Sequence, residues 1–212
     1  TTPEGNTALG NSAMKLTTTG ADNVAVGRRA LCTNTTGGNN TSIGPYTMTS
    51  NTTGAGNVAV GIQALCSNTT ASNNTAVGLD ALKANTTGTE NVAVGQLALT
   101  SNTTGDENTA IGRYSLGSNT TGEKNTAIGK SALYVNTTGN SNTAVGCGSL
   151  DANTTASQNT AMGYESMGVT STGCKNVAVG ANSLVANTTG NFNTAIGKSA
   201  FERSTTATCN TG

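Results

Sequence analysis

Residues that could do chemistry are few and scattered in this chain of 212 residues, which holds ten carboxylates, five cysteines and no histidine. Catalysis usually needs a general base, a nucleophile or a metal, and the missing histidine removes the commonest base and ligand. Asp106, Glu107 and Glu123 come nearest to an acidic cluster, which could bind calcium weakly, although we favour a solvated acidic turn. The patterns G-G-x-G-x-D and G-x-x-x-x-G-K-[ST] are absent. We therefore expect no enzyme, no cofactor and no metal.

A repeat organises the whole chain. An asparagine recurs every 17 residues from Asn6 to Asn193, without insertion or deletion, and begins the unit N-[TV]-A-[VIL]-G-x-x-[AS]-L-x-x-N-T-T-G-x-x. Twelve full copies cover residues 6–209, and partial copies cover 1–5 and 210–212. We number the positions of each copy from 1, its first asparagine, to 17. We treat residues 1–212 as one repeat array.

The repeat predicts an all-β fold, a parallel β-solenoid with one 17-residue repeat per rung and about twelve rungs. Val, Ile and Thr favour strands, whereas Gly and Asn-Thr-Thr-Gly are turn signals. Seventeen residues are also too few for most helical repeats. Because each rung lies on the last, an insertion would break the register, so a constant length is expected.

Two apolar columns are expected to form the core. Position 4 is always apolar and is predicted to point inward with position 2. Position 9 is always Leu, Met or Phe. The predicted core residues include Val26, Ile43, Val60, Val77, Leu31, Leu65, Leu82 and Leu99.

Asparagine and threonine are expected to form polar ladders inside the rungs. Identical side chains stacked at one-rung spacing can hydrogen-bond along the column. The predicted ladder residues include Asn34, Asn51, Asn68, Thr36, Thr53 and Thr70. The same N-T-T triplets are glycosylation acceptors at nine sites, but the structural ladder is the favoured explanation.

Position 3 carries a small residue in every copy, although alternation predicts that its side chain points outward. A close-packed neighbour, such as another copy of the chain, would explain this, and a tight corner is the alternative. Ala25, Ala59 and Ala76 are therefore candidate contacts between chains.

The cysteines are poorly placed for disulfides within one chain. Cys32 and Cys66 share position 10 two rungs apart, about 9.6 Å, whereas a disulfide needs Cα atoms within about 7 Å. Free thiols are the favoured state, and Cys209 is the best candidate for a bond between chains. We expect open rung edges to stack end to end into filaments.

The charges exclude some partners. The charges of ten basic and ten acidic residues cancel, so the charge does not favour nucleic-acid binding. The sequence contains no run of about 18 apolar residues, so we expect no membrane insertion. Tyr46, Tyr114 and Tyr134 are candidate contacts for a surface glycan or receptor, but they occupy different columns and are not expected to cluster. Threonine columns raise ice binding as another alternative.

The pattern N-T-A-[VI]-G-x-x-A-L-x-x-N-T-T-G resembles the head repeats of trimeric autotransporter adhesins. It is also similar to arrays in phage tail fibres and bacterial surface proteins, over residues 1–212. The resemblance implies an extracellular, fibrous attachment protein at a cell surface or on a virion, with other copies of itself as partners. We expect a structural fibre or adhesin shaft that assembles laterally, end to end or in both ways.

Overall fold

The computed structural model describes residues 4–212, and the chain is a parallel β-solenoid in which one 17-residue repeat forms each rung. Every strand has three residues, at positions 2 to 4 of its copy. Of the partial copy 1–5, residues 1–3 lie outside the described residues. The chain divides into two compact units, residues 1–106 and 107–212.

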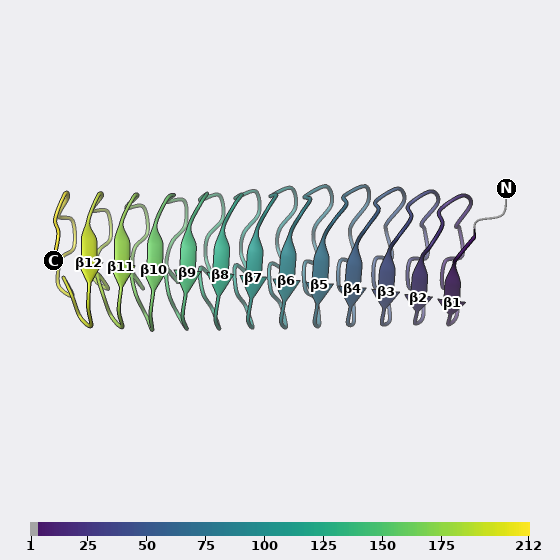
Figure 1. The fold of residues 1–212 in the computed structure, drawn as a ribbon, viewed down its shortest axis with the longest axis horizontal. Helices are drawn as coiled ribbons and strands as arrows, with labels where there is room; N and C mark the ends of the chain where they lie inside the picture. The colour runs from purple at the N-terminus through teal and green to yellow at the C-terminus, as the bar shows by residue number, and fades with distance from the viewer. Residues whose placement is uncertain (1–3) are drawn as a thin grey trace. The chain divides into compact units, whose positions relative to one another are not determined.

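The first unit contains six strands that follow each other in chain order (Figure 1). Each pairs in parallel with the strand 17 residues away, so that Thr7 lies opposite Val24 and Val60 opposite Val77. The strands are β1 (Thr7–Leu9), β2 (Val24–Val26), β3 (Thr41–Ile43), β4 (Val58–Val60), β5 (Thr75–Val77) and β6 (Val92–Val94).

The second unit repeats this arrangement with the same register. Thr109 lies opposite Thr126, and Val179 lies opposite Ile196. The strands are β7 (Thr109–Ile111), β8 (Thr126–Ile128), β9 (Thr143–Val145), β10 (Thr160–Met162), β11 (Val177–Val179) and β12 (Thr194–Ile196).

Hydrogen bonds join consecutive rungs on the other sides of the coil as well. At position 9, the Leu65 amide donates to the Ala81 carbonyl at 3.0 Å. At position 13, the Thr35 amide donates to the Thr52 carbonyl at 2.8 Å. Because these bonds satisfy backbone groups outside the short strands, the turn segments keep the same register as the sheet.

The interior is narrow and is filled by small side chains and one leucine column. The predicted core residues Leu31, Leu65, Leu82 and Leu99 are all 0 % exposed. The alanines of position 3 from Ala25 onward are buried to the same extent. The apolar interior therefore consists mainly of methyl groups beside a column of larger side chains.

The other predicted core column, position 4, points outward, so this part of the prediction was wrong. Val26, Val60 and Val77 are half-buried and Ile43 is exposed. Alternation holds, but with the opposite phase: in a strand of three residues the middle side chain points inward and its two neighbours point outward. Beside the leucine column, only a residue as small as alanine fits at this middle position.

The same reversal corrects the predicted contacts between chains. Ala25, Ala59 and Ala76 are 0 % exposed, so they cannot touch another subunit. Their constant small size reflects the tight interior of the rung and not a close neighbour outside it.

The turns contain several residues in the left-handed region. In one rung of the first unit, Gly61 has φ 129°, Gln63 φ 56° and Leu65 φ 53°. A Cβ on Gly61 would lie 2.5 Å from the carbonyl oxygen of Gly78, so glycine is required at position 5. Positions 7, 9 and 17 carry ordinary L-residues at positive φ, as at Gln63, Leu65 and Glu90, although this conformation is unfavourable for them.

Candidate functional site

The outer face of the sheet carries an apolar column at position 4 beside threonines and valines at position 2. It is formed by the side chains of positions 2 and 4, which sequence analysis had placed inside. Val58 and Ile43 in the first unit are 36 % and 39 % exposed, and Val177 and Met162 in the second are 37 % and 42 % exposed. We call positions 2 and 4 of the strands the sheet face. Its aliphatic side chains recur in every copy and have no partner inside the rung.

The predicted asparagine ladder of position 12 is present and fully buried. Asn51 donates from Nδ2 to Oδ1 of Asn34 at 2.9 Å, and Asn68 donates to Asn51 at 2.8 Å. Asn34 also donates to the carbonyl of Gly37 at 2.9 Å. The amides therefore close the corner of each rung while they join it to the next rung.

The asparagines of position 1 form a second ladder. Asn23 donates from Nδ2 to the carbonyl of Gly37 at 3.0 Å, and its Oδ1 accepts from the backbone amide of Asn40 at 3.0 Å. The carbonyl at position 15 thus receives both asparagines of its rung. This shared acceptor explains why both asparagines recur.

The threonine prediction was wrong for the residue that it named. Thr36, Thr53 and Thr70 of position 14 are exposed. Their neighbours at position 13 form the ladder instead: Thr35 Oγ1 donates to the carbonyl of Thr52 at 3.0 Å. Adjacent threonines point in different directions, so only one of each pair can bond within the coil.

The N-T-T triplets are unsuitable as glycan acceptors in the folded chain. Their asparagines are 0 % exposed, and Asn34 and Asn51 use their Nδ2 groups in the ladder. Glycosylation would replace a donated hydrogen with a bulky sugar inside the rung. The nine asparagines concerned are Asn34, Asn51, Asn68, Asn85, Asn102, Asn119, Asn136, Asn153 and Asn187.

A third polar column lies at position 16. Its side chains accept hydrogen bonds from backbone amides of the preceding rung: Ser72 Oγ from Ala55 at 3.0 Å and Asn191 Oδ1 from Cys174 at 2.7 Å. The sequence contains a signal for this column, because every residue at position 16 from Ser72 onward can accept a hydrogen bond.

Acidic residues do not gather into a metal site. Asp106 Oδ1 accepts from the Thr89 amide at 2.6 Å, and Glu107 lies 3.9 Å from Lys124 Nζ. Among residues 4–212, no group of three or more His, Cys, Asp or Glu side chains could hold a metal ion. The same range contains no helix with the length and apolarity that membrane crossing requires.

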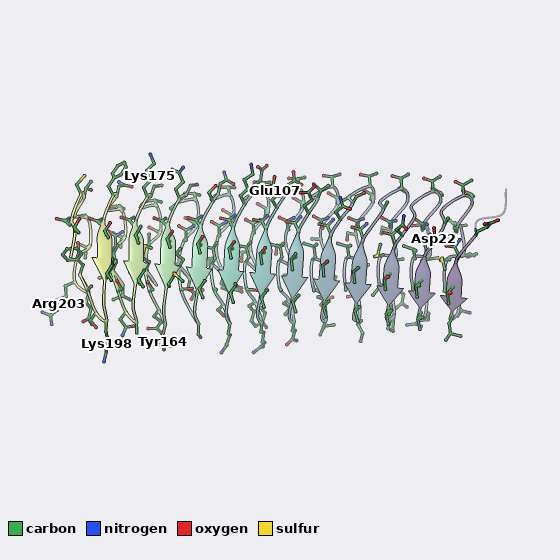
Figure 2. All side chains as sticks on the ribbon, viewed as in Figure 1. Asp22, Glu107, Tyr164, Lys175, Lys198 and Arg203 are labelled. Carbon is green, nitrogen blue, oxygen red and sulfur yellow. The ribbon has the colours of Figure 1, made fainter. Side chains whose placement is uncertain are left out.

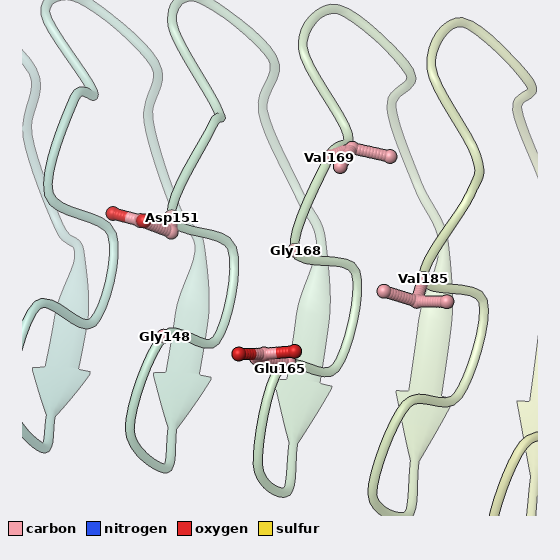
Figure 3. A pocket seen from close by; sticks show the side chains of 6 residues that line it. All are labelled: Gly148, Asp151, Glu165, Gly168, Val169 and Val185. Carbon is pink, nitrogen blue, oxygen red and sulfur yellow. The ribbon is translucent and has the colours of Figure 1, made fainter.

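One carboxylate pair was not anticipated. Asp151 and Glu165 come from neighbouring rungs and line a pocket of about 240 Å³ (Figure 3). Gly148 and Gly168 leave this space open where other copies carry side chains. Burial raises the pKa of Asp151 above its ordinary value, and the charge of Glu165 raises it further.

The cysteines are free thiols. Cys32 is buried and Cys66 half-buried, whereas Cys147 and Cys209 are exposed. Cys174 accepts a long hydrogen bond from the Ser157 amide, 3.4 Å from its sulfur. Cys209 is therefore accessible to a second chain, although the bond itself stays a prediction.

The tyrosines correct a further expectation. Tyr114 and Tyr134 pack edge to face, with ring centroids 5.8 Å apart, and Tyr46 lies under the guanidinium of Arg28 at 4.7 Å. Positions 7 and 10, which the sequence suggested were separate, therefore lie near each other on one side of the coil.

Comparisons with protein-family models, with curated proteins and with solved structures find no match to this chain.

Proposed function

We propose that this chain is a structural part of an extracellular fibre or adhesin shaft, and that copies associate laterally through the sheet face. The observation that carries the proposal is the sheet face itself, whose outward aliphatic side chains recur at position 4 of every copy and are joined at position 2 by threonine or valine. Covering one such partly exposed side chain contributes about 1 kcal/mol. Because the side chains repeat in every rung, the contributions add along the coil.

The partner that fits this surface best is a second copy of the chain. Its rungs have the same spacing, about 4.8 Å, so every row of the sheet face can meet an equivalent row. A globular partner without this period would match only a few rows. The resemblance of the repeat to trimeric adhesin heads and tail fibres supports self-association and a place at a cell surface or on a virion.

Sedimentation velocity tests lateral association. A variant with Ile43→Lys and Val77→Lys puts two charges on the sheet face of the first unit while leaving the buried columns intact. We expect the wild type to sediment as an oligomer and the variant as a monomer, because burying unpaired charges at an interface is costly.

The matched control is Gln96→Lys, which adds a charge at an exposed residue on position 6. It should leave the oligomer unchanged. A wild-type chain that remains monomeric at high concentration, or equal losses in variant and control, would show that the sheet face is not an interface.

A disulfide through Cys209 is a separate proposal about the same assembly, supported by the exposure of this thiol. Non-reducing electrophoresis of oxidised protein should show a covalent dimer that Cys209→Ser abolishes and Cys147→Ser retains. A dimer that survives Cys209→Ser would assign the bond to another thiol.

Ice binding is a second candidate function, favoured by the exposed threonine column. Position 14 is threonine in all twelve copies, and each of these side chains is exposed. A row of methyl and hydroxyl groups at one-rung spacing is a regular surface for ordered water. Measured thermal hysteresis that Thr53→Lys and Thr87→Lys reduce would support this function, and its absence in the wild type would remove it.

A further inference from the structure

An aromatic and cationic patch lies on the second unit, away from the sheet face. Tyr114 and Tyr134 are packed edge to face, with an interplanar angle of 64°. The Arg113 guanidinium lies 4.5 Å from the centre of the Tyr114 ring, and its Nη2 donates to the Tyr114 hydroxyl at 3.2 Å. Cation–π contact and the hydrogen bond hold this arginine beside the rings.

Gly117 provides the space in which the Tyr134 ring lies. A Cβ on Gly117 would come within 3.1 Å of Cδ2 and Cε2 of Tyr134. Position 10 carries a side chain in every copy but this one and the copy with Gly168. Tyr134 therefore rests against backbone, while 38 % of its surface remains exposed. A partly exposed ring that is held against the backbone is a rigid stacking surface.

The positive charges of the patch are not neutralised. Arg113 and Lys130 occupy position 6 in consecutive copies and are both exposed. The two ion pairs found among residues 4–212 are Lys83 with Asp80 and Lys124 with Glu107. Neither cation of the patch takes part in them, so both can bind an external anion.

We propose that Arg113, Tyr114, Lys130 and Tyr134 form a binding site for an acidic glycan, a saccharide that carries carboxylate or sulfate groups. The apolar face of a sugar ring stacks on the exposed Tyr134 ring. Arg113 and Lys130 bind the acidic group, the arginine through paired hydrogen bonds. Charge alone would attract any polyanion, whereas the aromatic surface selects ligands with a ring to stack.

The first unit contains a related arrangement. Arg28 and Arg29 lie 4.7 Å and 6.0 Å from the centre of the Tyr46 ring. These residues also occupy positions 6 and 7 of their copies. In both places an aromatic ring at position 7 lies beside an arginine that has no ion pair within the described residues. The arginines of the first unit must therefore be removed before binding to the patch on the second unit is measured.

The test is calorimetric titration of the full chain, in a background carrying Arg28→Gln and Arg29→Gln. The probes are an oligogalacturonate, a heparin oligosaccharide and neutral maltohexaose. We expect binding of one or both acidic probes and none of the neutral one. Comparing the two acidic probes distinguishes carboxylate from sulfate recognition.

Variants then separate the site from general charge attraction. Tyr134→Ala and Arg113→Gln should each weaken binding about tenfold or more, while Tyr134→Phe should retain it because the ring remains. Tyr164→Ala is the matched control, since Tyr164 is an exposed tyrosine of the same unit that lies outside the patch. Figure 2 shows Tyr164 with Lys198 at the edge of the sheet where the strands end.

Three results would overturn the proposal. These are no binding of either acidic probe, binding that Tyr134→Ala leaves unchanged, and an equal loss in Tyr164→Ala. Sedimentation of each variant shows whether its assembly is intact, so a failed glycan site is distinguished from failed self-association.

Discussion

The amide oxygen of Asn153 is buried next to the copy that carries Thr170 at position 12, and neither Asn153 Oδ1 nor Thr170 Oγ1 has a hydrogen-bond partner. From Asn34 to Asn102 the column is continuous, and Asn153 itself donates to Asn136 at 2.8 Å. Thr170 therefore interrupts the asparagine ladder and leaves two buried polar atoms unsatisfied.

Replacing this threonine should repair the ladder. In Thr170→Asn, the new Nδ2 can donate to Asn153, and the new Oδ1 can accept from Asn187. We expect the free energy of unfolding to rise by about 1–3 kcal/mol, measured by chemical denaturation.

The reciprocal variant is Asn136→Thr, which creates the same interruption in an intact part of the column. It should lower the free energy of unfolding by a similar amount. If Thr170→Asn destabilises the chain or leaves it unchanged, the amide hydrogen bonds are not what makes asparagine preferred at this position.

The sequence predicted the fold class because a constant repeat length with strand-forming residues and turn signals leaves few alternatives. Leu31 was correctly placed inside because position 9 is apolar in every copy, and Asn34 because stacked asparagines can hydrogen-bond along their column. The predicted orientation of the strand was wrong because the larger apolar side chain, at position 4, was assumed to be the buried one. Val26 is larger and more apolar than Ala25, yet the narrow rung accepts only a small residue at position 3, alanine or, at Ser42, serine.

Other features could not be predicted because they depend on backbone conformation. Leu65 adopts φ 53°, which no residue preference indicates for leucine. This turn brings positions 7 and 10 near each other, so Tyr114 meets Tyr134. The role of Gly117 likewise becomes visible only when the ring that lies against it is seen.

The reversed strand gives a sharp prediction about the core. Ala76→Val adds two methyl groups inside the rung and should lower the free energy of unfolding by about 1–3 kcal/mol through overpacking. Val77→Ala removes apolar atoms from the half-buried sheet face, encloses no cavity and should cost less than about 1 kcal/mol. Thermal denaturation of dilute protein compares the two. A larger loss of stability in Val77→Ala than in Ala76→Val would restore the original assignment of position 4 to the core.

Replacing a residue at position 7 by glycine should stabilise the chain, because the backbone at this position is left-handed. Gln63 has φ 56°, and relief of this conformation, roughly 1–2 kcal/mol, outweighs the chain entropy of glycine, about 0.5–1 kcal/mol. We expect Gln63→Gly to raise the free energy of unfolding by about 0.5–1 kcal/mol. Gln96→Gly is the control because Gln96 is not at positive φ, and it should lower stability. Equal losses in both variants would mean that Gln63 is not strained.

The pocket of the second unit predicts a pH-dependent stability. Burial first, and the Glu165 charge second, raise the folded-state pKa of Asp151 above that of the unfolded chain. The folded state therefore binds this proton more readily, so its stabilising contribution is complete at acid pH and is lost as the pH rises through the raised pKa.

Asp151→Asn removes the ionisation and should raise the melting temperature at neutral pH. Because the site is open to solvent, the gain stays below about 1 kcal/mol, and it should disappear toward the ordinary aspartate pKa of about 4. Glu123→Gln is the control, since Glu123 is an exposed carboxylate of the same unit outside the pocket. Melting curves from acid to neutral pH check both variants. A gain in Asp151→Asn that persists unchanged at acid pH would show that packing, and not the charge of Asp151, causes it.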